Sequence, residues 1–325
     1  MNLANLFTLA TLTTAINTLP TPPTRLGKSG LFEEKPVPTT YVVIENRNGT
    51  LTLVENTNRD DDPKQTGNKK RQRRTFELMH LPESGKLLPS ELNVAAFGES
   101  DQAEDQAKVI NDKLQDMKNN VETTIEYHRV GAISGIIYDA DGSVIYNLYN
   151  EFGITEKVIS IDFSNPDEDV RGKLREAKRY AEKALGVSLV TGWLSYCSAS
   201  FYDQLVNHAQ VKEAFKGWQA AGDRLAEDMR EGFSFEGITF IEYEVSVGST
   251  KFIDDDVSRL VPKVKGLFKQ FYGPANYNET VNTLGKPMYA KAEERSLGKG
   301  WKLEAQSNPL AMCTAPGALV KLLAT

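Results

Sequence analysis

Apolar residues recur every three or four positions over residues 99–127, which is the spacing of an amphipathic helix. At about 1.5 Å per residue such a helix would be roughly 40 Å long, more than a small domain requires. We therefore predict a spine helix that runs along one domain. Its apolar stripe consists of Ala103, Ala107, Ile110, Leu114, Met117, Val121 and Ile125.

A second helix is predicted at about 166–185, where apolar residues again recur at helical spacing. Ser164 or Asn165 can cap its first turn, and Pro166 suits the first helical position because it has no N–H to leave unpaired. Gly186 can end the helix, since glycine readily adopts the left-handed conformation that follows a last turn.

Beyond this helix the chain has an α/β pattern. Residues 187–194 and 237–247 are apolar on both faces, as buried central strands are, and helical stretches lie between them. Residues 301–323 are strand-like but interrupted by prolines. Earlier in the chain, Asp141-Gly142 separates two short β-rich runs and predicts a hairpin over 133–149.

Residues 39–82 are predicted to form an extended β-arm. Two β-rich runs, 41–46 and 51–54, flank Asn48-Gly49, a dipeptide that favours the positive φ angles of a two-residue hairpin turn. A polar and charged stretch follows, and a return strand is predicted at 75–81.

The first 38 residues combine a short apolar stretch with several prolines. Pro20 and Pro22 exclude a long helix or a central strand after Ile16, because proline fixes φ and lacks an N–H donor. We predict an arm with little core of its own, whose apolar residues are covered by other subunits. Because no basic residue precedes Arg25, the stretch does not have the pattern of a secretory signal. A soluble, cytosolic chain is expected when the protein is made.

Composition narrows the classes of protein further. With 325 residues, of which 40% are hydrophobic, the chain can form two domains or one core with long appendages. A net charge of −6 argues against extensive wrapping of nucleic acid. Two cysteines, Cys197 and Cys313, are too few for a disulfide framework.

We identify no catalytic, cofactor-binding or metal-binding residues. Cys197 follows an apolar strand, where a cysteine usually acts as a small hydrophobic side chain. Gly27-Lys28-Ser29 lacks the upstream glycine of a phosphate-binding loop. Asp254-Asp255-Asp256 cannot all face one cation from a strand or helix, so we interpret this run as solvated loop charge.

Three stretches carry a resemblance to a known family. The first runs from Leu185-Gly186-Val187 through a helix to 211–214, the second begins at Phe235-Glu236-Gly237, and the third leads from Gly300-Trp301 into Ser307-Asn308-Pro309-Leu310. With the order of elements, they resemble the major capsid proteins of tailed bacteriophages, and within these the lambda-like E family. The resemblance implies an α+β fold of the HK97 type.

The resemblance also implies a division into parts. It places an axial α/β domain at 187–285, completed by 314–325, and a peripheral domain at 83–186 with the spine helix, completed by 286–313. The preceding parts are the N-terminal arm, 1–38, and the extended β-arm or E-loop, 39–82.

By this resemblance the protein is structural and has no enzymatic activity. Copies would self-assemble as pentamers and hexamers into an icosahedral shell around the phage genome, so the protein would be found in the virion after assembly in the host cytoplasm. The implied partners are further copies, a scaffold protein, a portal, a maturation protease, a decoration protein and packaged double-stranded DNA held without sequence specificity. No cofactor or membrane is implied.

The charged tip of the β-arm is the candidate site. Residues 59–74 carry seven positive and three negative charges, a net +4, which leaves −10 on the rest of the chain. Contact with an acidic patch on an adjacent subunit, a solvated loop tip and nucleic-acid contact are the three alternatives. A nucleic-acid-binding protein using the basic run 69–74 is therefore the alternative function, although no aromatic residues interleave to stack bases. The candidate contact residues are Asp60, Asp61, Asp62, Lys69, Lys70, Arg71, Arg73 and Arg74.

Overall fold

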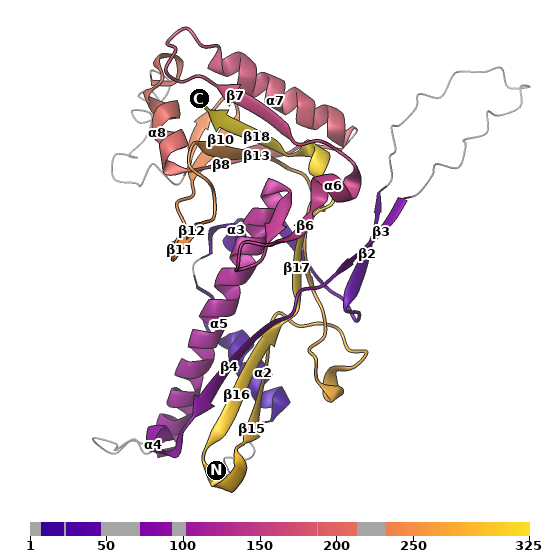
Figure 1. Cartoon of the computed structure of the whole chain (residues 1–325), viewed down its shortest axis with the longest axis vertical. Coiled ribbons are helices and arrows are strands. Elements are labelled where there is room, and N and C mark those ends of the chain that lie inside the picture. Colours follow the sequence, from indigo (N-terminus) through magenta and orange to yellow (C-terminus); the bar gives the residue numbers. More distant parts are fainter. Residues whose placement is uncertain (1–7, 23, 47–71, 93–101, 187, 213–231) are drawn as a thin grey trace, which may run out of the picture. The chain divides into compact units, whose positions relative to one another are not determined.

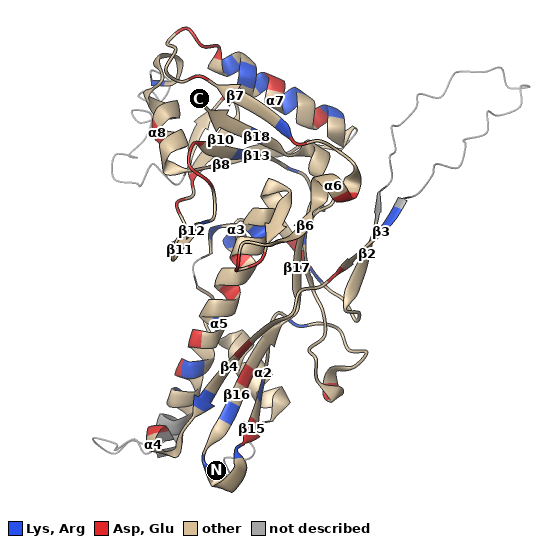
Figure 2. Cartoon of the chain, in the orientation of Figure 1, with Lys and Arg blue, Asp and Glu red and all other residues tan. Residues whose placement is uncertain are grey.

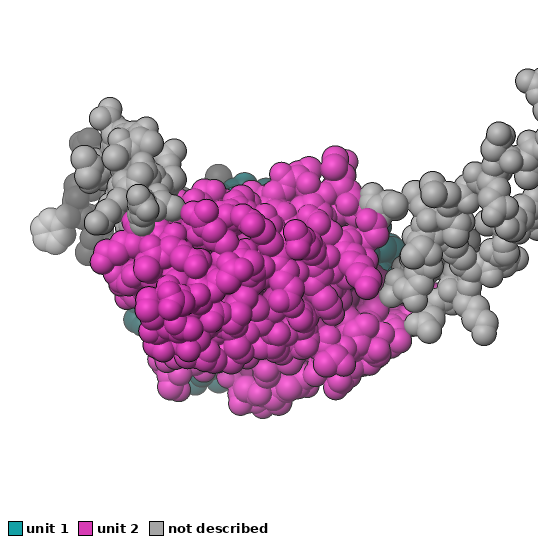
Figure 3. Space-filling model, turned by 90° about the horizontal axis from the view of Figure 1, so that it is seen from above, with its two compact units in different colours: residues 1–43, 75–129, 268–312 teal, residues 44–74, 130–267, 313–325 magenta. Residues whose placement is uncertain are grey.

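The computed structural model describes residues 8–22, 24–46, 72–92, 102–186, 188–212 and 232–325 (Figure 1). The chain divides into two compact units, each assembled from separate stretches of sequence (Figure 3). Unit 1 comprises residues 1–43, 75–129 and 268–312, and unit 2 comprises residues 44–74, 130–267 and 313–325.

The predicted spine helix is present in unit 1 as α5, Gln102–Ser134, and the boundary between the units falls within it, after Arg129. Most of its apolar stripe is buried, because it packs against a sheet and a second helix, while Ala107 is half-buried. The buried members of the stripe are Ile110, Leu114, Met117, Val121 and Ile125.

An antiparallel sheet of three strands covers α5 in unit 1. The strands are β15 (Tyr289–Glu294), β16 (Trp301–Ser307) and β4 (Leu81–Leu87), in the order β15-β16-β4. Side chains alternate between the two faces of a strand, so Leu303 and Ala305 enter the core while Lys302 points outward. The short helix α4 (Pro89–Leu92) follows β4, and a 3-10 turn, η4 (Ser296–Gly298), joins β15 to β16.

The N-terminal segment belongs to this unit, and the expectation that other subunits cover its apolar residues was wrong for the part described. Helix α2 (Leu9–Thr18) packs on β15, and the short helix α3 (Arg25–Lys28) follows. Leu12, Ile16 and Leu26 are buried by the chain itself. The prolines after α2 end it, but one short amphipathic helix suffices to fill a space beside α5.

The N-terminal segment then continues as β1 (Phe32–Pro36), the edge strand of a second three-stranded sheet in the order β1-β14-β17. Strand β1 runs parallel to β14 (Phe268–Tyr272), and β17 (Pro309–Cys313) lies on the other side. A loop containing η3 (Asn278–Thr280) joins β14 to β15.

Unit 2 is built around a six-stranded mixed sheet in the order β7-β18-β13-β8-β10-β9. Its core also contains apolar side chains of α7 (Val170–Leu185) and α8 (Ala199–Asn207), which pack on the sheet. The strands are β7 (Lys157–Ile161), β8 (Gly192–Cys197), β9 (Phe233–Phe235), β10 (Ile238–Glu242), β13 (Val257–Lys263) and β18 (Val320–Ala324).

Helix α7 begins later than predicted, so Pro166 is not its first residue and neither Ser164 nor Asn165 caps it. Asp169 is the N-cap, and its Oδ1 accepts a hydrogen bond from the Gly172 N–H at 2.9 Å. The side chain of Asn165 instead accepts from the Asp167 N–H in a local turn, which competes with helix. Gly186 ends the helix at a φ of 64°, as predicted.

The division into units differs from the predicted domain boundary at 186. Strand β7 pairs in parallel with the last strand, β18, and α7 contributes to the core of the same sheet. Residues 157–185 therefore fold with the six-stranded sheet and not with the spine helix. The last strand lies inside this sheet, between β7 and β13, after the 3-10 turn η5 (Pro316–Ala318).

Two hairpins and the base of the β-arm complete the described part. The predicted hairpin at Asp141-Gly142 is present as β5 (Ile136–Tyr138) and β6 (Val144–Asn147), followed by helix α6 (Leu148–Phe152). Strands β2 (Tyr41–Asn46) and β3 (Gln72–Glu77) pair at the base of the arm, while Asn48-Gly49 lies outside the described residues. A small hairpin is formed by β11 (Ser246–Val247) and β12 (Thr250–Lys251). No described helix meets the length and apolarity that a membrane span needs.

Candidate assembly surfaces

The β-arm tip is only partly described, so the predicted contact residues divide into two groups. Arg73 and Arg74 lie on β3, and Arg74 faces helix α6 within unit 2. Its Nη1 lies 3.8 Å from Glu151 Oε2, and its guanidinium lies 5.4 Å from the centre of the Phe152 ring. Arg74 thus has a partner within its own chain. The remaining candidates lie outside the described residues: Asp60, Asp61, Asp62, Lys69, Lys70 and Arg71.

A stripe of buried charges on α5 positions the N-terminal segment, and it was missed at the sequence level. Lys118 Nζ donates to the carbonyls of Ile16, at 3.1 Å, and Leu19, at 2.7 Å, at the C-terminal end of α2. A cation is favourable there because the last carbonyls of a helix carry partial negative charge. The four members of the stripe are Lys118, Glu122, Glu126 and Arg129.

Two turns further along α5, Glu126 binds backbone N–H groups of a helix, whereas Lys118 binds backbone carbonyls. Its carboxylate accepts hydrogen bonds from the N–H groups of Leu26, at 2.6 Å, and Gly27, at 3.1 Å, in the helix α3. Arg129 Nη1 lies 3.3 Å from the same carboxylate, and this side chain also donates to Gln270 Oε1, at 3.3 Å, on β14. The charged stripe therefore ties the N-terminal segment and the second sheet of unit 1 to the spine helix.

Burial shifts the pKa of two members of this stripe, Glu122 and Lys118. It raises the pKa of Glu122 above its usual value, against the opposing attraction of Arg129 and Lys118. It also lowers the pKa of Lys118. The signal in the sequence was the four-residue spacing of Lys118, Glu122 and Glu126, but this spacing equally fits a solvated helix face.

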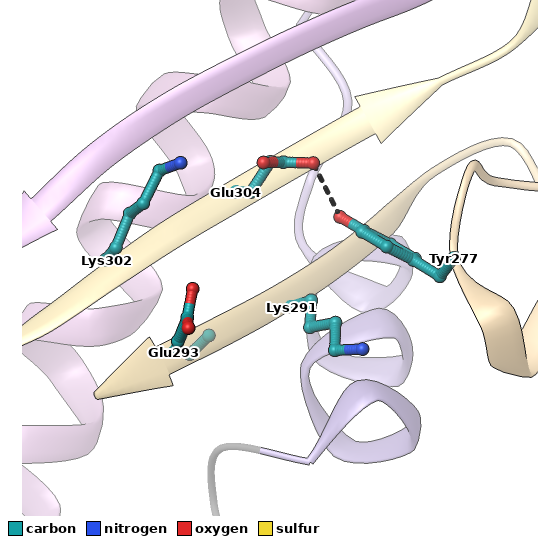
Figure 4. A pocket seen from close by; sticks show the side chains of 6 residues that line it. Tyr277, Lys291, Glu293, Lys302 and Glu304 are labelled. Carbon is teal, nitrogen blue, oxygen red and sulfur yellow. Dashed lines mark hydrogen bonds between the residues drawn. The ribbon is translucent and has the colours of Figure 1, made fainter. Parts of the chain in front are cut away.

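The outward face of the β15–β16 pair holds a shallow pocket of about 410 Å³ (Figure 4). Tyr277 donates to Glu304 Oε1 at 3.2 Å, and the ammonium group of Lys291 lies 5.1 Å from the centre of the Tyr277 ring. Lys302 and Glu293 face each other across the strands in register. This alternation of opposite charges suits a polar contact surface. Burial raises the pKa of the Tyr277 hydroxyl to about 12, so this hydroxyl stays protonated.

Charged residues also gather at two places in unit 2, along α7 and in the loops around β11 and β12 (Figure 2). On α7, Arg171 and Arg175 pair with Glu236, which lies in the turn between β9 and β10; Arg175 Nε is 3.0 Å from Glu236 Oε2. The pKa of Glu236 is lowered, chiefly by the hydrogen bond from Arg175.

Cys197 and the aspartate run 254–256 contact other side chains of the fold. Cys197 is buried beside Ser258, 3.0 Å away, and burial raises the pKa of its thiol to about 12, so the thiol stays protonated. In the aspartate run, Asp255 pairs with Lys251 at 2.7 Å while Asp256 accepts from Gln204 at 2.8 Å. No group of three potential metal ligands occurs among the residues that the structure describes.

This chain is similar to known phage capsid proteins. The family model described as phage major capsid protein E matches residues 8–324. The major capsid protein of Salmonella phage Felix O1 (isolate Felix O1-VT1) is 24% identical, over 98% of this chain and 96% of that protein. That of Pseudomonas phage KPP10 is 25% identical, over 77% of this chain and 78% of that protein.

The solved capsid of Myoviridae phage XM1 has the same fold. It matches with a TM-score of 0.51 at 10% identity, over 95% of this chain and 94% of that chain. The chain thus has the α+β, HK97-like capsid fold that the sequence predicted. Since the family model spans nearly the whole sequence, the chain belongs to the phage major capsid protein E family.

Proposed function

We propose that this chain builds the icosahedral shell of a tailed-phage head, with copies arranged as pentamers and hexamers around the genome. The match of the capsid family to residues 8–324 carries the proposal. In a closed shell, each copy must present different surfaces to its neighbours, and symmetry closes the repeated contacts.

The proposal assigns each part of the chain to a region of the capsid subunit. Unit 1 is the peripheral domain, unit 2 is the axial domain, and residues 39–82 form an arm that crosses a neighbouring copy. Exposed apolar side chains at the base of the arm support this role: Tyr41 is 47% exposed and Val43 48% exposed. Apolar side chains exposed together are typical of surfaces that a partner covers.

Family membership supports further partners. A scaffold protein, a portal, a maturation protease and a decoration protein would act on or beside the shell, which would be assembled in the host cytoplasm. The packaged double-stranded DNA would be enclosed without sequence-specific contacts. A net charge of −6 supports this, because an acidic protein does not attract a polyanion over its whole surface.

Electron microscopy of the purified protein tests the proposal. The full-length chain, expressed alone and together with a scaffold protein, should form closed shells of uniform diameter with resolvable pentamers and hexamers. Monomers or small oligomers under both conditions would refute a shell function.

A further inference from the structure

Helix α7 presents a ridge of basic side chains to solvent. Arg171, Arg175, Arg179 and Lys183 follow one another at four-residue intervals, about 6 Å apart along the helix, so they lie on neighbouring turns of one face. All four are exposed. The helix holds six basic and two acidic residues, a net +4.

Glu236 neutralises only the first half of this ridge. It accepts from Arg175, and Lys178 donates to its carbonyl oxygen at 2.6 Å. Arg179 and Lys183 have no ion pair with any residue that the structure describes. Half of the ridge therefore has an ion-pair partner in its own unit, and half is available to an external anion.

The opposite charge lies at the other end of the same sheet. Glu236 precedes β10, whereas residues 242–256 begin at the last residue of β10 and lead into β13. This loop contains five acidic residues and one lysine, a net −4. Asp254 and Asp255 are exposed, and Asp255 pairs with Lys251 of the same loop. Figure 1 shows α7 along the upper side of the unit 2 sheet and the β11–β12 hairpin below the sheet.

We propose that the basic ridge of α7 docks on the acidic loop 242–256 of a second copy of this chain, so that unit 2 associates head to tail. A surface and its complement on different sides of one unit form a heterologous contact, which closes into rings when the rotation allows. The inference rests on the proposed shell function and deepens it by naming a contact within the pentamers and hexamers.

The observations favour a second copy over a polyanion such as DNA. Every copy brings both surfaces: the basic half-ridge of Arg179 and Lys183, and the acidic loop 242–256. Pairing opposite potentials speeds association and fixes its register. A surface that binds nucleic acid would need no acidic partner surface. In this fold, the acidic loop 242–256 is present in the same unit as the basic ridge.

Charge reversal tests the contact. One variant carries Arg179→Glu and Lys183→Glu, a second carries Asp254→Lys and Asp255→Lys, and a third carries all four substitutions. We expect each two-site variant to lower shell yield about tenfold, as loss of two exposed ion pairs at every interface would do. The four-site variant should recover most of the yield, because its surfaces are again complementary. Lys265→Glu, an exposed residue elsewhere in unit 2, serves as the matched control and should assemble normally.

Circular dichroism and thermal unfolding of the subunits establish that each variant folds. Failure of the folded four-site variant to recover would overturn the contact, as would normal assembly of either two-site variant. If the Arg179 and Lys183 variant assembles normally but retains less DNA, the ridge binds a polyanion and the proposal is wrong. The wild type is assembled in parallel. If the wild type also forms no shells, the proposed shell function fails. If the wild type forms shells, the results for the variants test the contact alone.

Discussion

Buried charges on α5 decide how the N-terminal segment is held. The Glu126 side chain is only 4% exposed and that of Arg129 only 5%. Burial removes water from both charges, and the attraction between the two charges offsets this loss of hydration. Glu126→Ala would leave Arg129 buried without this carboxylate and two N–H groups of α3 without an acceptor. We expect a loss of about 3–5 kcal/mol in the free energy of unfolding of the subunit, measured by urea denaturation.

A matched control separates this effect from general sensitivity to substitution. Glu293 is exposed on β15, and Glu293→Ala should change the free energy of unfolding by less than about 0.5 kcal/mol. If Glu126→Ala is as mild as Glu293→Ala, the buried stripe does not hold the N-terminal segment.

Glu122 gives the subunit a pH dependence of defined sign. Because burial raises its pKa, the folded chain binds more protons here than the unfolded chain between the usual and the raised pKa. The stability contributed by the protonated form is present at acid pH and is lost as the pH rises through the raised value.

Glu122→Gln keeps a neutral side chain at every pH. In urea unfolding, the free energy of unfolding of the variant relative to that of the wild type should therefore increase as the pH rises from the usual glutamate pKa through the raised pKa of Glu122. Glu293→Gln, the same substitution at an exposed position, serves as the matched control. A constant difference between Glu122→Gln and wild type at all pH values would show that Glu122 does not titrate differently on folding.

Among the elements, those with a long periodic pattern were predicted best. The apolar stripe of α5 specified the helix, and Asp141-Gly142 specified the β5–β6 turn, because both signals are local. The start of α7 was misplaced because Asn165 makes a turn of its own. The docking of α2 could not be predicted, since its partners on α5 and β15 are distant in the sequence.

The observed start of α7 can be tested at its cap. Asp169→Ala removes the acceptor of the Gly172 N–H and should lower the free energy of unfolding by about 1 kcal/mol, whereas Asp169→Asn, which retains a side-chain oxygen, should cost less. Thermal unfolding of the subunit measures both. A larger loss for Asn165→Ala than for Asp169→Ala would restore the start predicted from the sequence.

At the scale of the whole molecule, the sequence predicted the family but not the contact surfaces. A charged tip was visible in the run Lys69 to Arg74, since five of its six residues are basic. The ridge of α7 and the loop 242–256 are separated by more than fifty residues, and the strand order of the sheet does not follow the order of the chain. Such a pairing leaves no local signal.

The arm tip can be divided experimentally into assembly and folding roles. Lys69→Gln, Lys70→Gln and Arg71→Gln together should impair shell formation and leave subunit unfolding unchanged, because we expect these charges to face a neighbour. Arg74→Gln should instead lower subunit stability by about 0.5–1 kcal/mol, since Arg74 contacts Glu151 and Phe152. Particle counts and thermal unfolding check the two results, and an unchanged shell yield for the triple variant would exclude the arm contact.

The alternative function is nucleic-acid binding through the same basic run, and it depends on the charge of the whole chain. Residues 59–74 carry +4, but the remaining −10 repels a phosphate backbone, so attraction is confined to one short segment. We expect unassembled subunits to show no saturable binding to a short DNA duplex in fluorescence anisotropy at about 150 mM salt. A genuine DNA-binding surface would behave otherwise: the logarithm of its binding constant would fall with the logarithm of salt concentration, with a slope of about −0.9 for each phosphate neutralised. If such a slope appeared and the triple arm variant abolished it, the basic run would bind DNA, and its role as a subunit contact would be excluded.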